Sequence, residues 1–286
     1  MSSTTSPKTS KIPSTIPVTT KLPRILCLHG GGVNAAIFAA QSRSLIRHLQ
    51  HSFRLVWADA PFLCDPHPDV VNVYGSYAPF RRWLRWQPEH TEIDADSGID
   101  EIGYALRRAM EDDDREGGIG EWVGLMGFSQ GAKLSASLLL EQQAREERAQ
   151  REGREAETGL TGMFGLNWKF GILLAGRAPL CNLNPEILKT EALVSVGNIS
   201  EGFQFCKEVD KEAKLRKPTL HVHGMADSGL FLHRKLLHGY CEKGTTTLIE
   251  WEGAHRIPLK SKDVDRVVEA IYHIAESTGV DVTWTV

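Results

Sequence analysis

Short apolar runs alternate with amphipathic stretches along almost the whole chain after Arg24, and this alternation restricts the fold more than any other feature. Runs of this length are typical of buried strands, and the stretches between them have the spacing of covering helices. Strand and helix in turn predict an α/β protein with a mostly parallel sheet and helices on both faces. The six predicted strands are residues 24–30, 53–59, 122–128, 170–176, 218–224 and 246–252.

Two of the connecting stretches show helical spacing clearly. Apolar residues recur at steps of three and four within 99–110 and again within 263–275. This spacing gathers them on one face, so both helices are predicted to pack on the sheet.

The length and composition fit one large domain. The chain has 286 residues, 41% hydrophobic and 24% charged, which is enough to bury a substantial core. We expect residues 21–286 to form this domain. The net charge of −3 argues against nucleic-acid binding, and no apolar run approaches the roughly 18 residues of a membrane helix.

Residues 1–20 differ from the rest of the chain. They are rich in Ser, Thr and Pro, lack acidic residues and have no hydrophobic centre of the kind found in secretion signals. Such a segment buries too little apolar surface to offset its ordering entropy, so a disordered tail is predicted. A transit peptide is the alternative, but such peptides usually carry Arg, which this segment lacks.

The cysteines indicate a reducing environment. All five are scattered along the chain, and none belongs to a C-x-x-C pair. This pattern argues against a disulfide framework and against a zinc site. A cytoplasmic location fits best.

Two insertions interrupt the alternation. The segment 141–160 mixes charges of both signs at helical spacing, which predicts a solvated helix extension rather than a binding surface. The segment 60–98 is too long for an ordinary connection and is rich in proline and aromatic residues, which suits a lid or a pocket wall. Its aromatic residues fit a substrate pocket and a local core equally well.

A candidate nucleophile, Ser129, follows the third predicted strand. The residues from Gly127 to Gly131 spell G-x-S-x-G, with a strand before them and a plausible helix after them. The chemistry of this motif needs that context, because a strained strand-to-helix turn exposes the hydroxyl and small neighbours let the backbone pass.

A serine nucleophile needs a base, and the base needs a carboxylate to orient it. In sheets of this kind the chain order is Ser, then acid, then His, each on a loop at the carboxyl end of a strand. Asp227 follows the fifth predicted strand and His255 follows the sixth. Asp227 is therefore the predicted acid and His255 the predicted base.

The other histidines are weaker candidates among the 11 in the chain. His221 and His223 lie within a predicted strand, and we expect structural roles for them, one on each face of the sheet. His233 falls in a predicted helix. His67 and His90 lie in the 60–98 insertion and are candidates for touching substrate.

The oxyanion of an acyl-transfer reaction needs two backbone N–H donors. Gln130, directly after the candidate nucleophile, supplies the first. The second is expected from the loop after the first strand, where three glycines let the backbone approach a reacting carbonyl. Gly31 is the preferred donor, with Gly32 and Val33 as alternatives.

Five motifs together resemble one known family. They are LCLHGGGVNAAIF, DAPF, GFSQGA, HVHGMADS and EGAHRIP. In these motifs the chain resembles the FSH family of α/β-hydrolases, which includes yeast serine hydrolases, a human ovarian-cancer-associated homologue and thioesterases encoded in fungal polyketide gene clusters. The resemblance covers nearly the whole chain after residue 20. The charged insertion and the glycine-rich early loop depart from it.

The resemblance implies an α/β-hydrolase fold with a lid-like insertion, and an intracellular serine hydrolase that uses Ser129, Asp227 and His255. It implies no metal and no organic cofactor. The substrate would be an acyl ester or thioester, in the most specific form a polyketide acyl chain released or edited on a carrier protein. The alternatives are a general small-ester carboxylesterase and a non-catalytic ligand receptor.

Substrate choice must come from the pocket, because the three predicted side chains serve esters and thioesters alike. Arg81, Arg82 and Arg85 either meet a carboxylate or the phosphate of a phosphopantetheine arm, or form a solvated helix face. The candidate substrate contacts in the insertion are Phe62, Tyr77, Phe80, Trp83 and Arg82.

Overall fold

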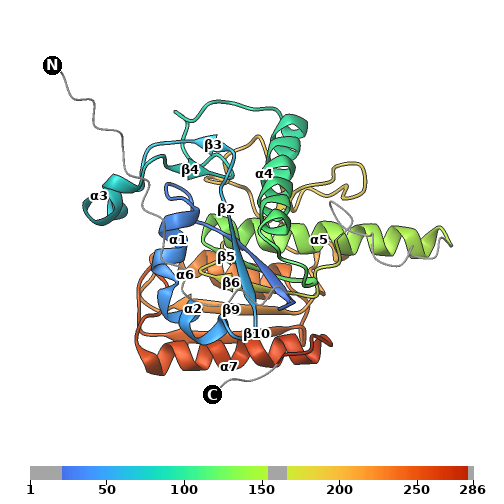
Figure 1. Cartoon of the computed structure of the whole chain (residues 1–286). Coiled ribbons are helices and arrows are strands. Elements are labelled where there is room, and N and C mark those ends of the chain that lie inside the picture. The colour runs from blue at the N-terminus through green and yellow to red at the C-terminus, as the bar shows by residue number, and fades with distance from the viewer. Residues whose placement is uncertain (1–20, 154–165, 283–286) are drawn as a thin grey trace.

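The computed structural model describes residues 21–153 and 166–282 (Figure 1). The predicted tail at 1–20 and the last part of the charged insertion lie outside these residues. Within them, no helix combines the length and the apolar character that crossing a membrane requires.

A six-stranded sheet forms the centre of the molecule, and every neighbouring pair in it is parallel. This confirms the predicted sheet and all six predicted strands. Their spatial order is β10-β9-β6-β5-β1-β2. The bounds are β1 Arg24–Leu28, β2 Arg54–Ala58, β5 Trp122–Phe128, β6 Phe170–Leu174, β9 Thr219–Gly224 and β10 Thr246–Trp251.

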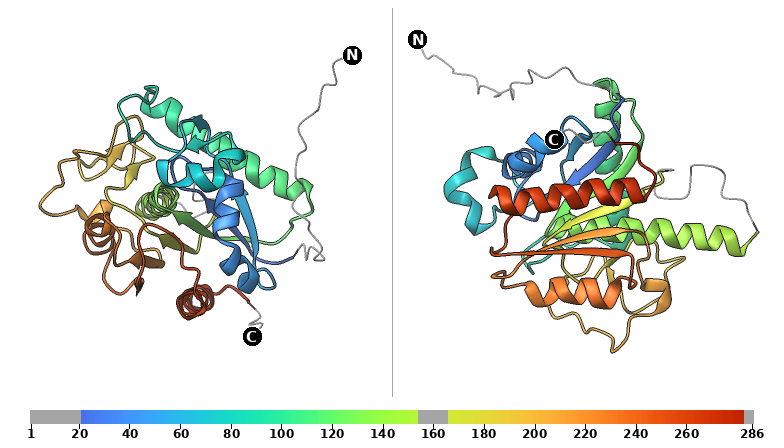
Figure 2. Two further views of the ribbon diagram at one scale, coloured as in Figure 1. Left: turned by 90° about the vertical axis from the view of Figure 1, so that its left-hand side faces the viewer. Right: turned by 90° about the horizontal axis from the view of Figure 1, so that it is seen from below.

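Helices cover both faces of the sheet, as predicted (Figure 2). One core cluster contains buried residues of α4 and α5, and the other contains buried residues of α1, α2 and α7. The predicted apolar faces at 99–110 and 263–275 lie in α4 and α7 respectively. The bounds are α1 Ala35–Gln41, α2 Arg43–Leu49, α4 Ala95–Arg115, α5 Gln130–Arg151, α6 Leu230–Lys235 with the π-helical η4 Leu236–Tyr240, and α7 Ser261–Ser277.

The insertion at 60–98 folds into short elements above the carboxyl end of the sheet. An antiparallel pair, β3 Phe62–Leu63 and β4 Arg81–Arg82, brackets α3 Pro68–Tyr74 and the 3-10 turn η1 Gly75–Tyr77. The remaining short elements are β7 Cys181–Asn182, β8 Val194–Ser195 and the 3-10 turn η3 Lys211–Ala213.

Backbone hydrogen bonds tie this insertion to the loop after β1. Gly32 N–H donates to the Arg81 carbonyl at 3.0 Å, Arg81 N–H donates to the Val33 carbonyl at 2.8 Å, and His67 N–H donates to the Gly32 carbonyl at 3.0 Å. The insertion is thus a wall joined to the sheet by its own main chain.

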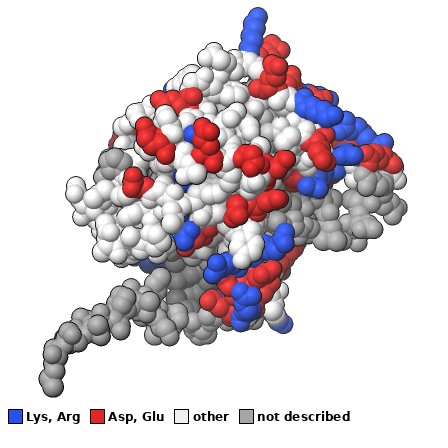
Figure 3. All heavy atoms as spheres, turned by 90° about the horizontal axis from the view of Figure 1, so that it is seen from above, with Lys and Arg blue, Asp and Glu red and all other residues white. Residues whose placement is uncertain are grey.

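Helix α5 continues from the sheet into the charged insertion and projects beyond the sheet edge (Figure 1). Its residues 141–144 are buried, which differs from the predicted solvated surface. The physical reason is that Gln142 and Gln143 satisfy loop backbone: Gln142 accepts from Trp168 N–H at 2.8 Å, and Gln143 accepts from Arg216 N–H at 2.7 Å. Charges of both signs gather on the side toward which α5 projects (Figure 3).

Candidate active site

The turn between β5 and α5 holds Ser129 in a strained conformation. Its φ of 53° and ψ of −109° lie where non-glycine residues are rare, and such strain is typical of functional sites. The Ser129 N–H donates to the Leu174 carbonyl of β6 at 2.8 Å, which fixes the turn to the neighbouring strand.

The two flanking glycines are required by close backbone approach. A Cβ on Gly127 would lie 2.3 Å from the Gly131 backbone, and a Cβ on Gly131 would lie 1.9 Å from the Leu28 carbonyl oxygen. Neither position has room for a side chain. Because Leu28 pairs with Gly127 in the sheet, the loop after β1 begins level with the serine turn.

His255 and Asp227 meet Ser129 at this rim. His255 Nε2 lies 2.9 Å from Ser129 Oγ, and His255 Nδ1 lies 2.6 Å from Asp227 Oδ2. Both distances are within hydrogen-bond range, so His255 Nε2 can exchange a proton with Ser129 Oγ while Asp227 orients the imidazole through Nδ1. The structure brings together the three residues that the sequence placed on separate loops.

Asp227 is buried and held by several donors. The Gly229 N–H donates to its Oδ1 at 2.7 Å, and Arg177 Nη2 lies 3.3 Å from the same oxygen. Burial alone would raise the pKa of this carboxyl, but the hydrogen bonds from His255 and the Gly229 N–H outweigh it and lower the pKa well below the usual value. Asp227 is therefore a carboxylate at neutral pH.

Beyond Asp227, further buried imidazoles follow one another into the core. His233 Nε2 lies 3.4 Å from Asp227 Oδ2, and the His233 ring stands 5.3 Å from that of His223. Burial lowers the pKa of His233 to about 3 and that of His223 to about 4, so both are neutral. The rings of His221 and His223 are 5.9 Å apart on one side of the sheet. The expectation of opposite faces was wrong, because residues two apart on a strand share a face.

The two residues predicted to supply backbone N–H groups to an oxyanion, Gln130 and Gly31, both line one cavity. Gln130 opens α5, where the first N–H groups have no partner within the helix. Gly31 lies in the cavity wall beside it. Of the alternatives, Gly32 has its N–H bonded to the Arg81 carbonyl, which favours Gly31.

His29 fixes the glycine loop as a neutral imidazole. Its Nε2 accepts from the Ala60 N–H at 3.0 Å, so its Nδ1 carries the proton and donates to the Gly30 carbonyl at 2.6 Å. Burial lowers the pKa of His29 to about 4, which agrees with this neutral form. The loop geometry beside Ser129 thus depends on a histidine that never needs to ionise.

A cavity of about 550 Å³ opens over Ser129. Its floor carries Ser129, Gln130 and His255, and apolar and cationic side chains of several loops surround them. The apolar and aromatic part of the lining comprises Val33, Val70, Tyr74, Leu84, Trp86, Phe128, Leu232, Ile257 and Leu259.

The five predicted substrate contacts do not line this cavity. Trp83 is fully buried and donates from Nε1 to the His29 carbonyl at 3.0 Å, while Phe80 packs in a small core cluster. Arg82 is buried over the Phe62 ring at 5.0 Å, and Tyr77 is on the outer surface. These residues form the interior and the outer surface of the wall, and the adjacent residues Leu84, Arg85 and Trp86 line the cavity.

Several lining residues were missed by sequence reasoning. Trp86, which was not among the five predicted contacts, covers Gly31. Arg85 was not missed, because it is the one of the three candidate arginines that lines the cavity, where it is buried. Lys133 lies one turn into α5, and Arg177 lies in the loop after β6. A signal for Arg177 was present, since LLAGRAP places it directly after a strand at the same rim.

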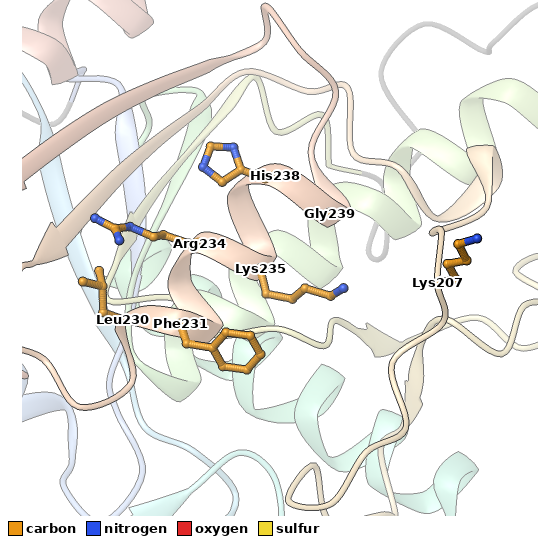
Figure 4. Close-up of a pocket in the computed structure, with 7 residues that line it drawn as sticks. All are labelled: Lys207, Leu230, Phe231, Arg234, Lys235, His238 and Gly239. Carbon is orange, nitrogen blue, oxygen red and sulfur yellow. The ribbon is translucent and has the colours of Figure 1, made fainter.

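A second cavity of about 590 Å³ lies over α6 and η4 (Figure 4). It is lined by Lys207, Leu230, Phe231, Arg234, Lys235, His238 and Gly239. No serine or cysteine is present in this lining.

One group of side chains has the arrangement of a metal site. Ligand atoms of Asp227, His233 and His255 lie within 4.8 Å of one another. Two imidazoles and a carboxylate suit zinc, but binding there would take the Asp227 oxygen that now accepts from His255. A metal bound by these three residues would therefore compete with the hydrogen bond between Asp227 and His255.

Comparison with known proteins identifies relatives over most of the chain. A sequence model of the family described as serine hydrolase (FSH1) matches residues 18–267. Esterase pigG of Monascus ruber is 50% identical over 267 residues, which cover 92% of this chain and 94% of that protein. Esterase claE of Penicillium crustosum is 47% identical, with 92% and 96% covered.

Solved structures support the fold. Zea mays acyl-protein thioesterase 2 superposes with a TM-score of 0.50 at 16% sequence identity, covering 91% of this chain and 96% of that one. Together with the parallel sheet and its covering helices, this similarity confirms the predicted α/β-hydrolase fold.

Proposed function

The chain belongs to the serine hydrolase (FSH1) family and is a hydrolase, and from this premise we propose that it cleaves acyl esters and thioesters with Ser129 as the nucleophile. The observation that carries the proposal is the unbroken contact path from Ser129 Oγ through His255 to Asp227, at 2.9 and 2.6 Å.

Acylation follows from this path. His255 Nε2 accepts the Ser129 proton while Oγ attacks the acyl carbonyl, and the Asp227 carboxylate stabilises the resulting imidazolium. The N–H groups of Gln130 and Gly31 donate to the developing oxyanion. His255 then gives its proton to the departing alcohol or thiol, leaving the acyl group on Ser129.

Deacylation repeats these roles with water. His255 Nε2 accepts a proton from the water that attacks the acyl-enzyme, and the same two N–H groups hold the second oxyanion. Return of the proton to Ser129 Oγ releases the carboxylic acid. The ionised state of Asp227 supports both steps, because each passes through an imidazolium.

The finer form of the proposal is release or editing of a polyketide acyl chain carried on a protein-bound thiol. The sequence resemblance to fungal cluster thioesterases supports it. So does a cavity that combines apolar side chains with the exposed cations Arg43 and Arg256, which suit a phosphate on a carrier arm. Five free cysteines support a reducing, cytoplasmic setting. A general carboxylesterase, with the same chemistry on small oxyesters, is the second candidate.

Labelling with a fluorophosphonate probe tests the nucleophile. Wild type should label, Ser129→Ala should not, and Ser76→Ala, an exposed serine of η1, should label like wild type. A folded wild type that stays unlabelled would instead favour the non-catalytic receptor. Matched acyl N-acetylcysteamine thioesters and oxyesters then separate the two substrate classes, since faster oxyester turnover would favour the carboxylesterase.

A further inference from the structure

The wall of the cavity over Ser129 is strongly cationic. Its lining includes five cations, Arg43, Arg85, Lys133, Arg177 and Arg256, against one acid, Glu201. Hydrolysis of a neutral ester needs none of them, so the excess positive charge calls for a separate explanation.

Lys133 is the least compensated of these cations. Its side chain is buried, and its Nζ donates to the Ser200 hydroxyl at 2.8 Å. An ammonium has three N–H donors, and this hydroxyl is the one acceptor that the described residues give it. No carboxylate of the described chain lies within ion-pair distance of it.

The burial of the Lys133 ammonium has an electrostatic cost in free energy. Burial lowers the pKa of Lys133; the nearby positive charge of Arg177 adds to this effect and Cys181 opposes it, with a net lowering. A buried charge without a partner is destabilising, and such groups are retained where function needs them. An anion placed beside Lys133 would offset both effects.

We propose that Lys133, Ser200 and Arg177 form a subsite for an anionic oxygen group, such as a carboxylate, on the acyl part of the substrate. The inference rests on the proposed hydrolase function and adds a substrate class to it. Ser200 supplies a neutral donor and acceptor, and Arg177, whose Nη2 lies 3.3 Å from Asp227 Oδ1, supplies a second cation of the same lining.

Burial places the anion on the acyl side. Lys133 is 7% exposed, whereas Arg43 and Arg256 are exposed cations of the same lining. A leaving group attached to a carrier has to extend toward solvent, so it meets the exposed cations. The acyl chain is the part that can reach the buried ammonium.

A substrate series tests the subsite. The substrates are ω-carboxyacyl N-acetylcysteamine thioesters from succinyl to suberyl, each paired with an isostere in which an isopropyl group replaces the carboxylate. Wild type should prefer the carboxylate member at one chain length. In Lys133→Met this preference in kcat/KM should fall about 10- to 100-fold, the range expected for a lost hydrogen bond to a charge. Lys262→Gln, an exposed lysine of α7, should keep the wild-type preference.

The substrate pairs and the Lys133→Met variant distinguish failure of the subsite from failure of the proposed hydrolase function. Wild type that hydrolyses both members equally at every length, or a preference that survives in Lys133→Met, overturns the subsite while leaving the hydrolase intact. If wild type hydrolyses neither member but Ser129 still labels with the fluorophosphonate, the subsite for these acyl chains is overturned and the nucleophile is not; if labelling also fails, the proposed function is overturned. If Lys133→Met loses a preference for hexanoyl-phosphopantetheine over hexanoyl-pantetheine instead, the anion is on the leaving group and the acyl assignment is overturned.

Unfolding temperature gives a readout independent of turnover. Lys133→Met should unfold at a higher temperature than wild type, because it removes an uncompensated buried charge. The preferred dicarboxylic acid product should raise the unfolding temperature of wild type and leave that of the variant unchanged. A lower unfolding temperature for Lys133→Met, with no product effect on wild type, would mean that Lys133 is structural.

Discussion

The side-chain amide of Gln130 forms two hydrogen bonds with the main chain of Leu84: it accepts from the Leu84 N–H at 3.0 Å and donates to the Leu84 carbonyl at 3.1 Å. The same amide oxygen accepts from the Trp83 N–H at 2.7 Å. Gln130 thus joins the cavity wall to the serine turn through its side chain, while its backbone N–H is the first oxyanion donor of the proposed mechanism.

Gln130→Ala should therefore damage both stability and catalysis. It leaves N–H groups of the wall without an acceptor, which costs about 1–3 kcal/mol each when buried. We expect a lower urea midpoint and a kcat/KM reduced about 10-fold or more. Gln87→Ala, an exposed residue of the same insertion, is the control. Wild-type values for Gln130→Ala would show that the wall is held by other contacts.

Gly31→Ala tests the second oxyanion donor. The added Cβ would lie 2.7 Å from Cζ3 of Trp86, so the loop must shift. Loss of one donor typically lowers kcat about 100- to 1,000-fold. The control is Gly75→Ala, whose added Cβ would have no atom within 4 Å, so kcat should stay at the wild-type value. Adding Trp86→Ala to Gly31→Ala should restore part of the rate, and absence of any rate loss in the single variant would assign the donor elsewhere.

The buried histidines predict acid sensitivity. Burial lowers the pKa of His221 and His233 to about 3 and that of His223 to about 4, against about 6.5 in an unfolded chain. Between these values the unfolded chain binds more protons, so stability falls as pH falls from about 6.5 toward 4. Each histidine contributes up to about 1.4 kcal/mol per pH unit.

His223→Leu isolates one of these contributions. Neither of its ring nitrogens has a hydrogen-bond partner within residues 21–153 and 166–282, so the substitution removes a titrating group without breaking a bond of the described chain. Urea unfolding between pH 7.5 and 4.5 should show a shallower slope than wild type, while His51→Gln, an exposed histidine, should not. An unchanged slope in His223→Leu would mean that this histidine ionises in the folded protein.

Zinc should inhibit by occupying Asp227, His233 and His255, which lie close enough to share one ion. Chelation with EDTA should leave turnover unchanged, because in the proposed mechanism His255 accepts and returns the proton while Asp227 stays ionised. His233→Leu removes one ligand and should weaken zinc inhibition about 10- to 100-fold; the loss of a ligand is expected to be at least as costly as that of an outer-shell partner. Loss of activity on EDTA treatment would contradict this scheme.

The sequence was sufficient for the sheet and for the residues at its rim. Strand periodicity and chain order located Ser129, Asp227 and His255, because the ends of parallel strands converge whatever their separation along the chain. For the wall formed by residues 60–98, the sequence did not predict which side chains face the cavity. Trp83 and Trp86 are both aromatic and three residues apart, yet one is core and the other faces the cavity. Irregular backbone has no period from which to assign faces.

Lys133 shows a further limit of sequence reasoning. A lysine within a helix is ordinarily expected at the surface, and only its depth beside Ser200 gives it a role. Similarly, the charged character of 141–160 predicted solvation, whereas residues 141–144 pack against loops that the sequence does not reveal as neighbours.

The wall made by residues 60–98 is held to the loop after β1 by paired main-chain hydrogen bonds. Because these bonds hold the wall on both sides of α3, we expect the present cavity to limit the size of the acyl chain that the protein accepts. Enlarging the repertoire of this enzyme would then require trimming the side chains that face inward, such as Trp86 and Tyr74, rather than loosening a hinge.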